Sequence, residues 1–175
     1  MKPEISSHIC AAATIDPRSL PPQQLFSRAS DLGISQEVTR RWAGAVIGRG
    51  EYIASTVMAK SHIAKRFAQH LSDLPALSLT THQRSEVDGF EKLLFTTPDG
   101  MGIETVLIPL KKVGSVSICL SSQVGCVMGC TFCATARMTK RRNLHSWEIL
   151  DQYIQARKLV LAQGRRVTGA VFMGM

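Results

Sequence analysis

A short loop that carries three cysteines constrains the fold more than any other feature of this chain. The cysteines follow a C-x3-C-x2-C pattern with an aromatic residue directly before the third: Cys126, Cys130, Phe132 and Cys133. Three thiolates on one loop can converge on a compact, soft metal centre, and a three-cysteine site leaves one position of that centre open. The pattern therefore favours a four-iron cluster whose fourth iron is free to bind a small molecule.

The cysteine loop lies inside a strand–helix–strand pattern. A predicted strand over residues 116–120 leads directly into the loop, and a helix is expected after it, with Ser146 as its N-cap and Gly164 just beyond its end. The apolar run over residues 167–173 then predicts a buried strand of the parallel type. These elements form one βαβ unit, which predicts an α/β protein.

The part of the chain before this unit is expected to be helical and then β-rich. Helices are predicted over residues 23–32, after Ser35 as an N-cap, and over residues 61–71. Two β-rich runs, 93–96 and 103–108, flank a Pro-Asp-Gly turn and predict a hairpin. The expected organisation has four parts: a leader (1–16), a helical accessory domain (17–77), a β-hairpin segment (78–110) and the βαβ unit (111–175).

The positive charge is concentrated in the second half of the chain. The net charge is +8. Residues 1–100 hold 11 Lys and Arg against 10 Asp and Glu, whereas residues 101–175 hold 10 against 3. A polyanion such as RNA would be attracted to this region, and Lys140, Arg141 and Arg142 could hold its phosphates. The alternative is a solvated basic surface that offsets the negative charge of a cluster.

Cysteine use indicates a reducing compartment. Five cysteines are present, and four of them lie within fifteen positions, which is typical of metal binding rather than of structural disulfides. No signal peptide or membrane-spanning apolar run is apparent, so the cytoplasm is the expected location and no membrane partner is expected. The alternative metal is zinc with Cys119 or His145 as fourth ligand, although zinc sites usually pair two C-x2-C units.

The motifs resemble one known family. The C-x3-C-x2-C motif is similar to the cluster motif of the radical S-adenosylmethionine (SAM) superfamily, and the runs around it resemble the RlmN/Cfr family. These runs are Ile-Glu-Thr-Val-Leu-Ile-Pro (103–109), Cys-Leu-Ser-Ser-Gln-Val-Gly-Cys (119–126), Arg-Asn-Leu (142–144) and Phe-Met-Gly-Met (172–175). The resemblance implies an α/β fold: the opening βαβ unit of a radical SAM partial (β/α) barrel, preceded by a small helical domain and a β-hairpin.

The resemblance also implies roles for individual residues. Cys126, Cys130 and Cys133 would ligate the 4Fe-4S cluster, and Phe132 would lie at the cofactor site. Cys119 would match the cysteine that resolves a covalent protein–RNA adduct. Glu104 would match the base that removes a proton from the substituted adenine.

The implied reaction is methylation of RNA by radical chemistry. The cofactors would be the 4Fe-4S cluster and S-adenosylmethionine, from which one electron releases a 5′-deoxyadenosyl radical. The substrates would be an adenine of 23S rRNA, with carbon 2 as the favoured position, and possibly tRNA. A flavodoxin or ferredoxin would supply the electron, and a methylated cysteine would carry the methyl group.

Some family motifs are absent from the sequence. A Gly-Glu-Pro motif that binds S-adenosylmethionine would follow Met175 in the family, as would the methyl-accepting cysteine. The chain is therefore expected to be a truncated form that is inactive alone and poorly soluble because its sheet is exposed. The competing hypothesis is a small basic RNA-binding module with a structural metal site and no catalytic activity.

Overall fold

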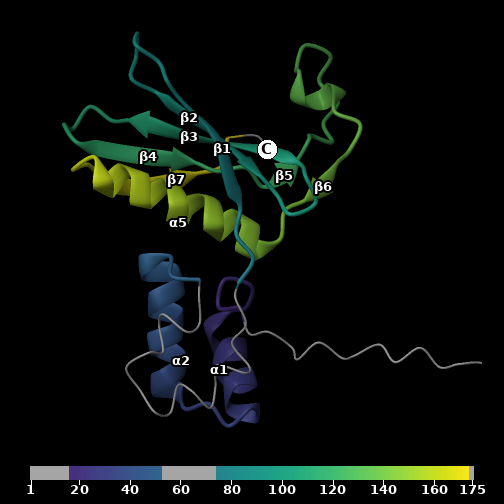
Figure 1. Cartoon of the computed structure of the whole chain (residues 1–175). Helices are drawn as coiled ribbons and strands as arrows, with labels where there is room; N and C mark the ends of the chain where they lie inside the picture. Colours follow the sequence, from purple (N-terminus) through teal and green to yellow (C-terminus); the bar gives the residue numbers. More distant parts are fainter. Residues whose placement is uncertain (1–15, 53–73, 174–175) are drawn as a thin grey trace, which may run out of the picture.

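The computed structural model describes residues 16–52 and 74–173 (Figure 1). Its centre is a five-stranded sheet in the order β1-β2-β3-β4-β7, with one long helix, α5, packed on one face and two short helices beyond it. The leader and the helix predicted over residues 61–71 lie outside the described residues, apart from Asp16.

The sheet combines an antiparallel half and a parallel pair. Its strands are β1 (Ser78–Arg84), β2 (Glu91–Thr96), β3 (Gly102–Pro109), β4 (Ser115–Cys119) and β7 (Arg166–Val171). The pairs β1/β2, β2/β3 and β3/β4 are antiparallel, and β4/β7 is parallel. The predicted two-stranded hairpin, β2 and β3, is therefore the centre of a four-stranded antiparallel segment, because β1 adds to the free edge of β2 and β4 to that of β3. The predicted division of the chain at residue 110 remains a prediction.

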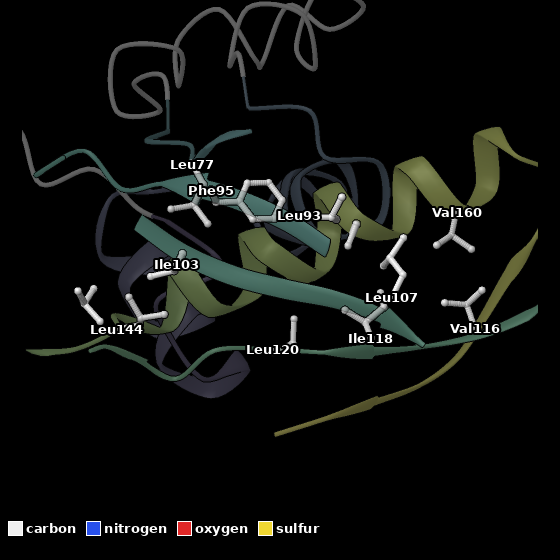
Figure 2. Close-up of a cluster of buried hydrophobic side chains, with 12 residues drawn as sticks. Leu77, Leu93, Phe95, Ile103, Leu107, Val116, Ile118, Leu120, Leu144 and Val160 are labelled. Carbon is white, nitrogen blue, oxygen red and sulfur yellow. The ribbon is translucent and has the colours of Figure 1, made fainter. Parts of the chain in front are cut away.

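Helix α5 (Ser146–Ala162) makes the crossover between β4 and β7 and covers the inner face of the sheet. The main hydrophobic core lies between them (Figure 2). It contains Leu77, Leu93, Phe95, Ile103, Leu107, Val116, Ile118, Leu120, Val124, Leu144, Ala156 and Val160. Alternate residues of β2 and β3 enter this core, so the residues between them point to the opposite face.

A second, smaller core holds the N-terminal helices together. Helix α1 (Pro22–Asp31) and helix α2 (Gln36–Ala43) are followed by one turn of π-helix, Gly44–Arg49, that ends at Gly50 in the left-handed conformation. Ser35 caps α2 as predicted, because its side chain accepts the backbone N–H of Val38. The buried residues are Leu25, Ala29, Ile34, Trp42, Val46 and Leu74.

Buried polar groups join the N-terminal region to α5. Arg18 and Asp151 are fully buried and form an ion pair at 3.2 Å. Asp151 also accepts the backbone N–H of Leu77 at 2.7 Å and the hydroxyl of Tyr52. Burial beside this carboxylate raises the pKa of Tyr52 well above its usual range. The network connects the turn before α1, the segment before β1 and the middle of α5.

Two sequence predictions need correction. The N-cap of α5 is His145 rather than Ser146, because the Glu148 carboxylate reaches back and accepts the His145 backbone N–H at 2.7 Å. The predicted buried strand is β7, which does pair in parallel with β4, but its side chains are largely exposed. Strand β7 is the edge of the sheet in the described chain, and Phe172 and Met173 just after it are 59% and 70% exposed.

Candidate active site

A two-stranded ribbon closes the cysteine loop at its base. Strand β5 (Gln123–Val124) pairs with β6 (Arg142–Asn143), and residues 125–141 form the loop that connects these two strands (Figure 1). A short 3-10 turn, Thr135–Arg137, lies on the returning side. Gly125 is the first residue of this loop and has φ +64°. A Cβ added there would lie 2.8 Å from the backbone oxygen of Lys140. The close approach of the two sides of the loop therefore requires glycine.

Two arginines of the basic run brace this loop. The Arg141 guanidinium donates to the backbone carbonyls of Ala136 and Met138, at 2.6 and 3.1 Å. Arg142 donates to Glu148 at 2.7 and 2.8 Å, tying the end of the loop to the first turn of α5.

Arg142 also donates to Asp99 in the turn between β2 and β3. Hydrogen bonding from Arg142 is the main reason why the pKa of the Asp99 carboxyl lies well below its usual range. Of the basic run, Arg141 and Arg142 thus have partners inside the protein, which favours a structural role for them over phosphate binding.

The strand register brings Glu104 and Cys119 to the same side of the sheet. Val106 of β3 lies directly opposite Cys119 of β4, and Glu104 is two residues from Val106 on the same strand face. All three residues line one cavity of about 250 Å³, together with Cys126, Cys133 and Met173 among others. The cavity lies at the carboxyl end of the parallel pair β4/β7, which is where α/β folds bind ligands.

Buried hydrogen bonds from α5 hold this corner of the site. The Gln152 side chain accepts the Thr105 hydroxyl at 2.8 Å and the Ser121 backbone N–H at 3.0 Å, and it donates to the Ser121 carbonyl at 3.0 Å. The Ser121 hydroxyl in turn donates to the backbone carbonyl of Glu104 at 2.6 Å. Gln152 thus sets the position of Glu104 relative to the segment that follows Cys119.

The cysteine loop offers a suitable donor set for an iron–sulfur cluster. The thiols of Cys126, Cys130 and Cys133 are free and partly accessible. Hydrogen bonds from the backbone N–H groups of Ala136 and then Thr135 lower the pKa of the Cys133 thiol, which favours the thiolate that a metal needs. The chemistry of these residues fits the cluster.

The loop does not hold the predicted residues in a preformed ligand arrangement. No group of three or more His, Cys, Asp or Glu side chains within residues 16–52 and 74–173 has the geometry of a metal site. Cys130 is not among the residues that line the cavity beside Cys126 and Cys133. Phe132 is 88% exposed on the outside of the loop. Their assignment to the cluster and the cofactor remains a prediction.

Sequence reasoning did not find the residues that position the site. Gln152 falls on the core-facing side of α5, and nothing in its local pattern distinguishes it from an ordinary helical residue. The partners of Arg141 and Arg142 were equally hidden, because Asp99 is 43 positions away from Arg142. The Arg-Asn-Leu run at residues 142–144 was the one sequence feature that could have indicated the role of Arg142, since it places an arginine where the cysteine loop ends.

Known proteins with similar sequences are RNA methyltransferases. A probable RNA methyltransferase of Myxococcus xanthus is 38% identical over 161 residues, which make up 90% of this chain and 44% of that relative. The dual-specificity RNA methyltransferase RlmN of Bdellovibrio bacteriovorus is 39% identical over 118 residues, or 66% of this chain and 29% of that relative. No protein-family model matches the chain.

A solved structure shares the fold. The crystal structure of a radical SAM methyltransferase from Sphaerobacter thermophilus is similar with a TM-score of 0.76 at 28% identity, over 93% of this chain and 47% of that chain. Over most of its length the chain is thus similar to RlmN-like RNA methyltransferases and to a radical SAM methyltransferase. Both the family resemblance and the α/β fold expected from the motifs are thereby confirmed. This RlmN-like chain spans less than half the length of each of these relatives.

The described residues of this RlmN-like chain include no helix long and apolar enough to cross a lipid bilayer.

Proposed function

We propose that this chain is part of a radical SAM enzyme that methylates carbon 2 of an adenine in 23S rRNA, and also in tRNA, through a methyl-cysteine intermediate. The observation that carries the proposal is the shared cavity in which Glu104 and Cys119 lie beside Cys126 and Cys133. The similarity to these relatives, and their names, support it. A flavodoxin or ferredoxin in the cytoplasm is the proposed electron donor.

The proposed cluster site is the cysteine loop. Cys126, Cys130 and Cys133 would hold a 4Fe-4S cluster, and Phe132 would contact the bound S-adenosylmethionine. When bound, these groups supply the radical chemistry that an unactivated methyl group and an adenine carbon require. The ribbon β5/β6 and the Arg141 brace hold the loop at the mouth of the cavity.

Glu104 and Cys119 have separate tasks in the proposal. The Glu104 carboxylate, on the exposed side of β3, accepts the proton that leaves the substituted adenine. The Cys119 thiolate resolves the covalent bond between protein and RNA. Their diagonal placement on neighbouring strands puts both groups on one side of a base that enters the cavity, and the Gln152 network keeps that spacing.

Anaerobic reconstitution of the chain with iron and sulfide tests the cluster assignment. A brown protein is expected, with four irons per chain and an electron paramagnetic resonance signal that changes when S-adenosylmethionine is added. A colourless protein that binds zinc through four sulfur ligands would contradict the proposal and favour an RNA-binding module with a structural metal.

The base and the resolving cysteine are tested in a version of the enzyme that contains the complete family core. Cys119→Ala is expected to accumulate RNA covalently bound to the protein, because the step that releases it is lost. Glu104→Gln is expected to slow release of methylated RNA without changing the iron content. Turnover of the Cys119 variant at the wild-type rate would remove Cys119 from the mechanism.

A further inference from the structure

The side of the sheet that faces away from α5 carries a row of neighbouring hollows that share lining residues. One, of about 430 Å³, is lined by Lys92, Leu94, Glu104 and residues of the cysteine loop. A second, of about 170 Å³, is lined by Thr81, Gln83, Lys92, Leu94 and Glu104. Both share Glu104 with the cavity that contains Cys119. We call this row the sheet groove; it runs across β1, β2 and β3 and ends at the candidate active site.

The register explains why these hollows lie in one row. Gln83 pairs with Lys92, Lys92 with Val106, and Val106 with Cys119. Residues paired in this way lie on the same face, so one row of side chains crosses four strands from β1 to Cys119. Helix α5 covers the opposite face (Figure 1).

Lys92 is the basic residue at the centre of the sheet groove, and it contacts the proposed base. Its Nζ lies 3.2 Å from a carboxylate oxygen of Glu104, and the two side chains are 53% and 45% exposed. An ion pair this accessible is weak, because water screens it and both side chains lose freedom when it forms. A phosphate that arrives in the groove can therefore displace the carboxylate from Lys92.

We propose that Lys92 is a substrate-responsive switch: its ammonium group pairs with Glu104 in the free protein and moves to a phosphate of single-stranded RNA when RNA enters the sheet groove. The exchange uncovers the Glu104 carboxylate only when substrate is present. This proposal rests on the proposed function, in which Glu104 is the base.

The chemistry of the groove favours a single RNA strand as its occupant. Thr81 and Gln83 offer hydrogen-bonding groups, and Leu94 offers an apolar surface against which a base can pack. The cysteine loop at one end of the groove carries Arg137 and Lys140 and no acidic residue, which complements a polyanion. Recognition of a single strand also suits a base that must leave its stack to reach Cys119.

The test measures the binding of a short single-stranded RNA to the 175-residue chain by fluorescence anisotropy, between about 50 and 200 mM salt. Lys92→Gln and Lys92→Ala remove the charge, and Lys111→Ala, at an exposed position beyond the far end of β3, is the matched control. Loss of one phosphate contact is expected to reduce the salt slope by about 0.7 and to weaken binding about fivefold at 0.1 M salt. Lys111→Ala is expected to leave the slope unchanged.

A double-mutant cycle separates the switch from simple repulsion. Glu104→Gln is expected to tighten RNA binding when Lys92 is present, since no ion pair must then be broken. In the Lys92→Ala background the same change should have at least a twofold smaller effect. Equal effects in both backgrounds would show that Glu104 only repels RNA, and the switch would be refuted.

Two outcomes separate the failure of this inference from that of the proposed function. If the wild-type chain binds RNA with a steep salt dependence but the Lys92 and Lys111 variants behave alike, the switch is wrong and the RNA function stands. If the wild-type chain binds no RNA, both fail. Self-association that buries the groove, seen by light scattering and lost on adding Lys92→Glu, would assign this face to a second copy and also refute the switch.

Discussion

Replacing Asp151 by alanine tests whether its buried polar network holds the N-terminal helical region against α5. The carboxylate accepts four hydrogen bonds: from Arg18 at 3.2 Å, from Leu77 N–H at 2.7 Å, from Gln155 at 2.9 Å and from the Tyr52 hydroxyl. The side chain is fully buried, so water does not replace these bonds when it is removed.

The magnitude follows from what the substitution leaves behind. Arg18 keeps Asp16 and the carbonyl of Pro75 as partners, so its charge is still partly compensated. The Leu77 N–H and the Tyr52 hydroxyl lose their acceptor in a buried region, at about 1–3 kcal/mol each. The expected loss of unfolding free energy is about 3–5 kcal/mol, the range for breaking a buried ion pair.

Urea unfolding, followed by far-UV circular dichroism, measures this loss. Glu37→Ala is the control, because its pair with Arg41 has side chains 73% and 71% exposed and is expected to contribute less than about 0.5 kcal/mol. Asp151→Asn should fall between the control and the alanine variant, since the amide retains one acceptor atom. A loss below about 1 kcal/mol for Asp151→Ala would refute the view that this network carries the connection.

Three further predictions concern the cysteine loop and its braces. Gly125→Ala should destabilise the chain more than Gly129→Ala: both glycines have positive φ, but only at Gly125 would the new Cβ meet a backbone oxygen at 2.8 Å; equal urea midpoints would contradict this. Burial opposes ionisation of Glu148, but hydrogen bonds from Arg142 outweigh it and lower the pKa of Glu148 below its usual range. Its stabilising effect is therefore present above about pH 4.5 and lost as pH falls through the lower folded pKa, so the gap in unfolding free energy between wild type and Glu148→Gln should be smaller at pH 3 than at pH 7; a constant gap would argue against the assignment. Cys126→Ala should abolish the cluster after anaerobic reconstitution, and full iron content in that variant would exclude Cys126 as a ligand.

Local sequence signals predicted the elements that depend on neighbouring residues. Ser35 caps α2 because its hydroxyl needs only a backbone N–H three residues away. Gly164, with φ +70°, ends α5 for the same kind of local reason. The predicted start of α5 was wrong by one residue. Ser146 is a typical N-cap residue, but the Glu148 carboxylate accepts the backbone N–H of His145 and so makes His145 the N-cap.

Features set by partners distant in the chain were not predictable in this way. The exposure of β7 depends on which strands flank it, and its apolar run alone could not reveal that it has a neighbour on one side only among residues 16–52 and 74–173. Strand β1 was equally hidden, because its polar, mostly exposed residues carry no alternating pattern. Gln152 shows its role only when Thr105 and Ser121 are brought against α5.

The sequence by itself determined the chemistry of this protein: three closely spaced cysteines, the motifs around them and the family to which they point, because ligand spacing and family motifs are short-range properties of the chain. Only the tertiary structure decided which groups meet. The antiparallel register of β3 and β4 places Glu104 near Cys119 on one face of the sheet. Gln152 of α5 holds this arrangement through Ser121, whose hydroxyl donates to the Glu104 carbonyl. On the face of the sheet away from α5, Lys92 contacts the Glu104 carboxylate. Such contacts join residues far apart in the chain, and they exist only after the sheet has formed.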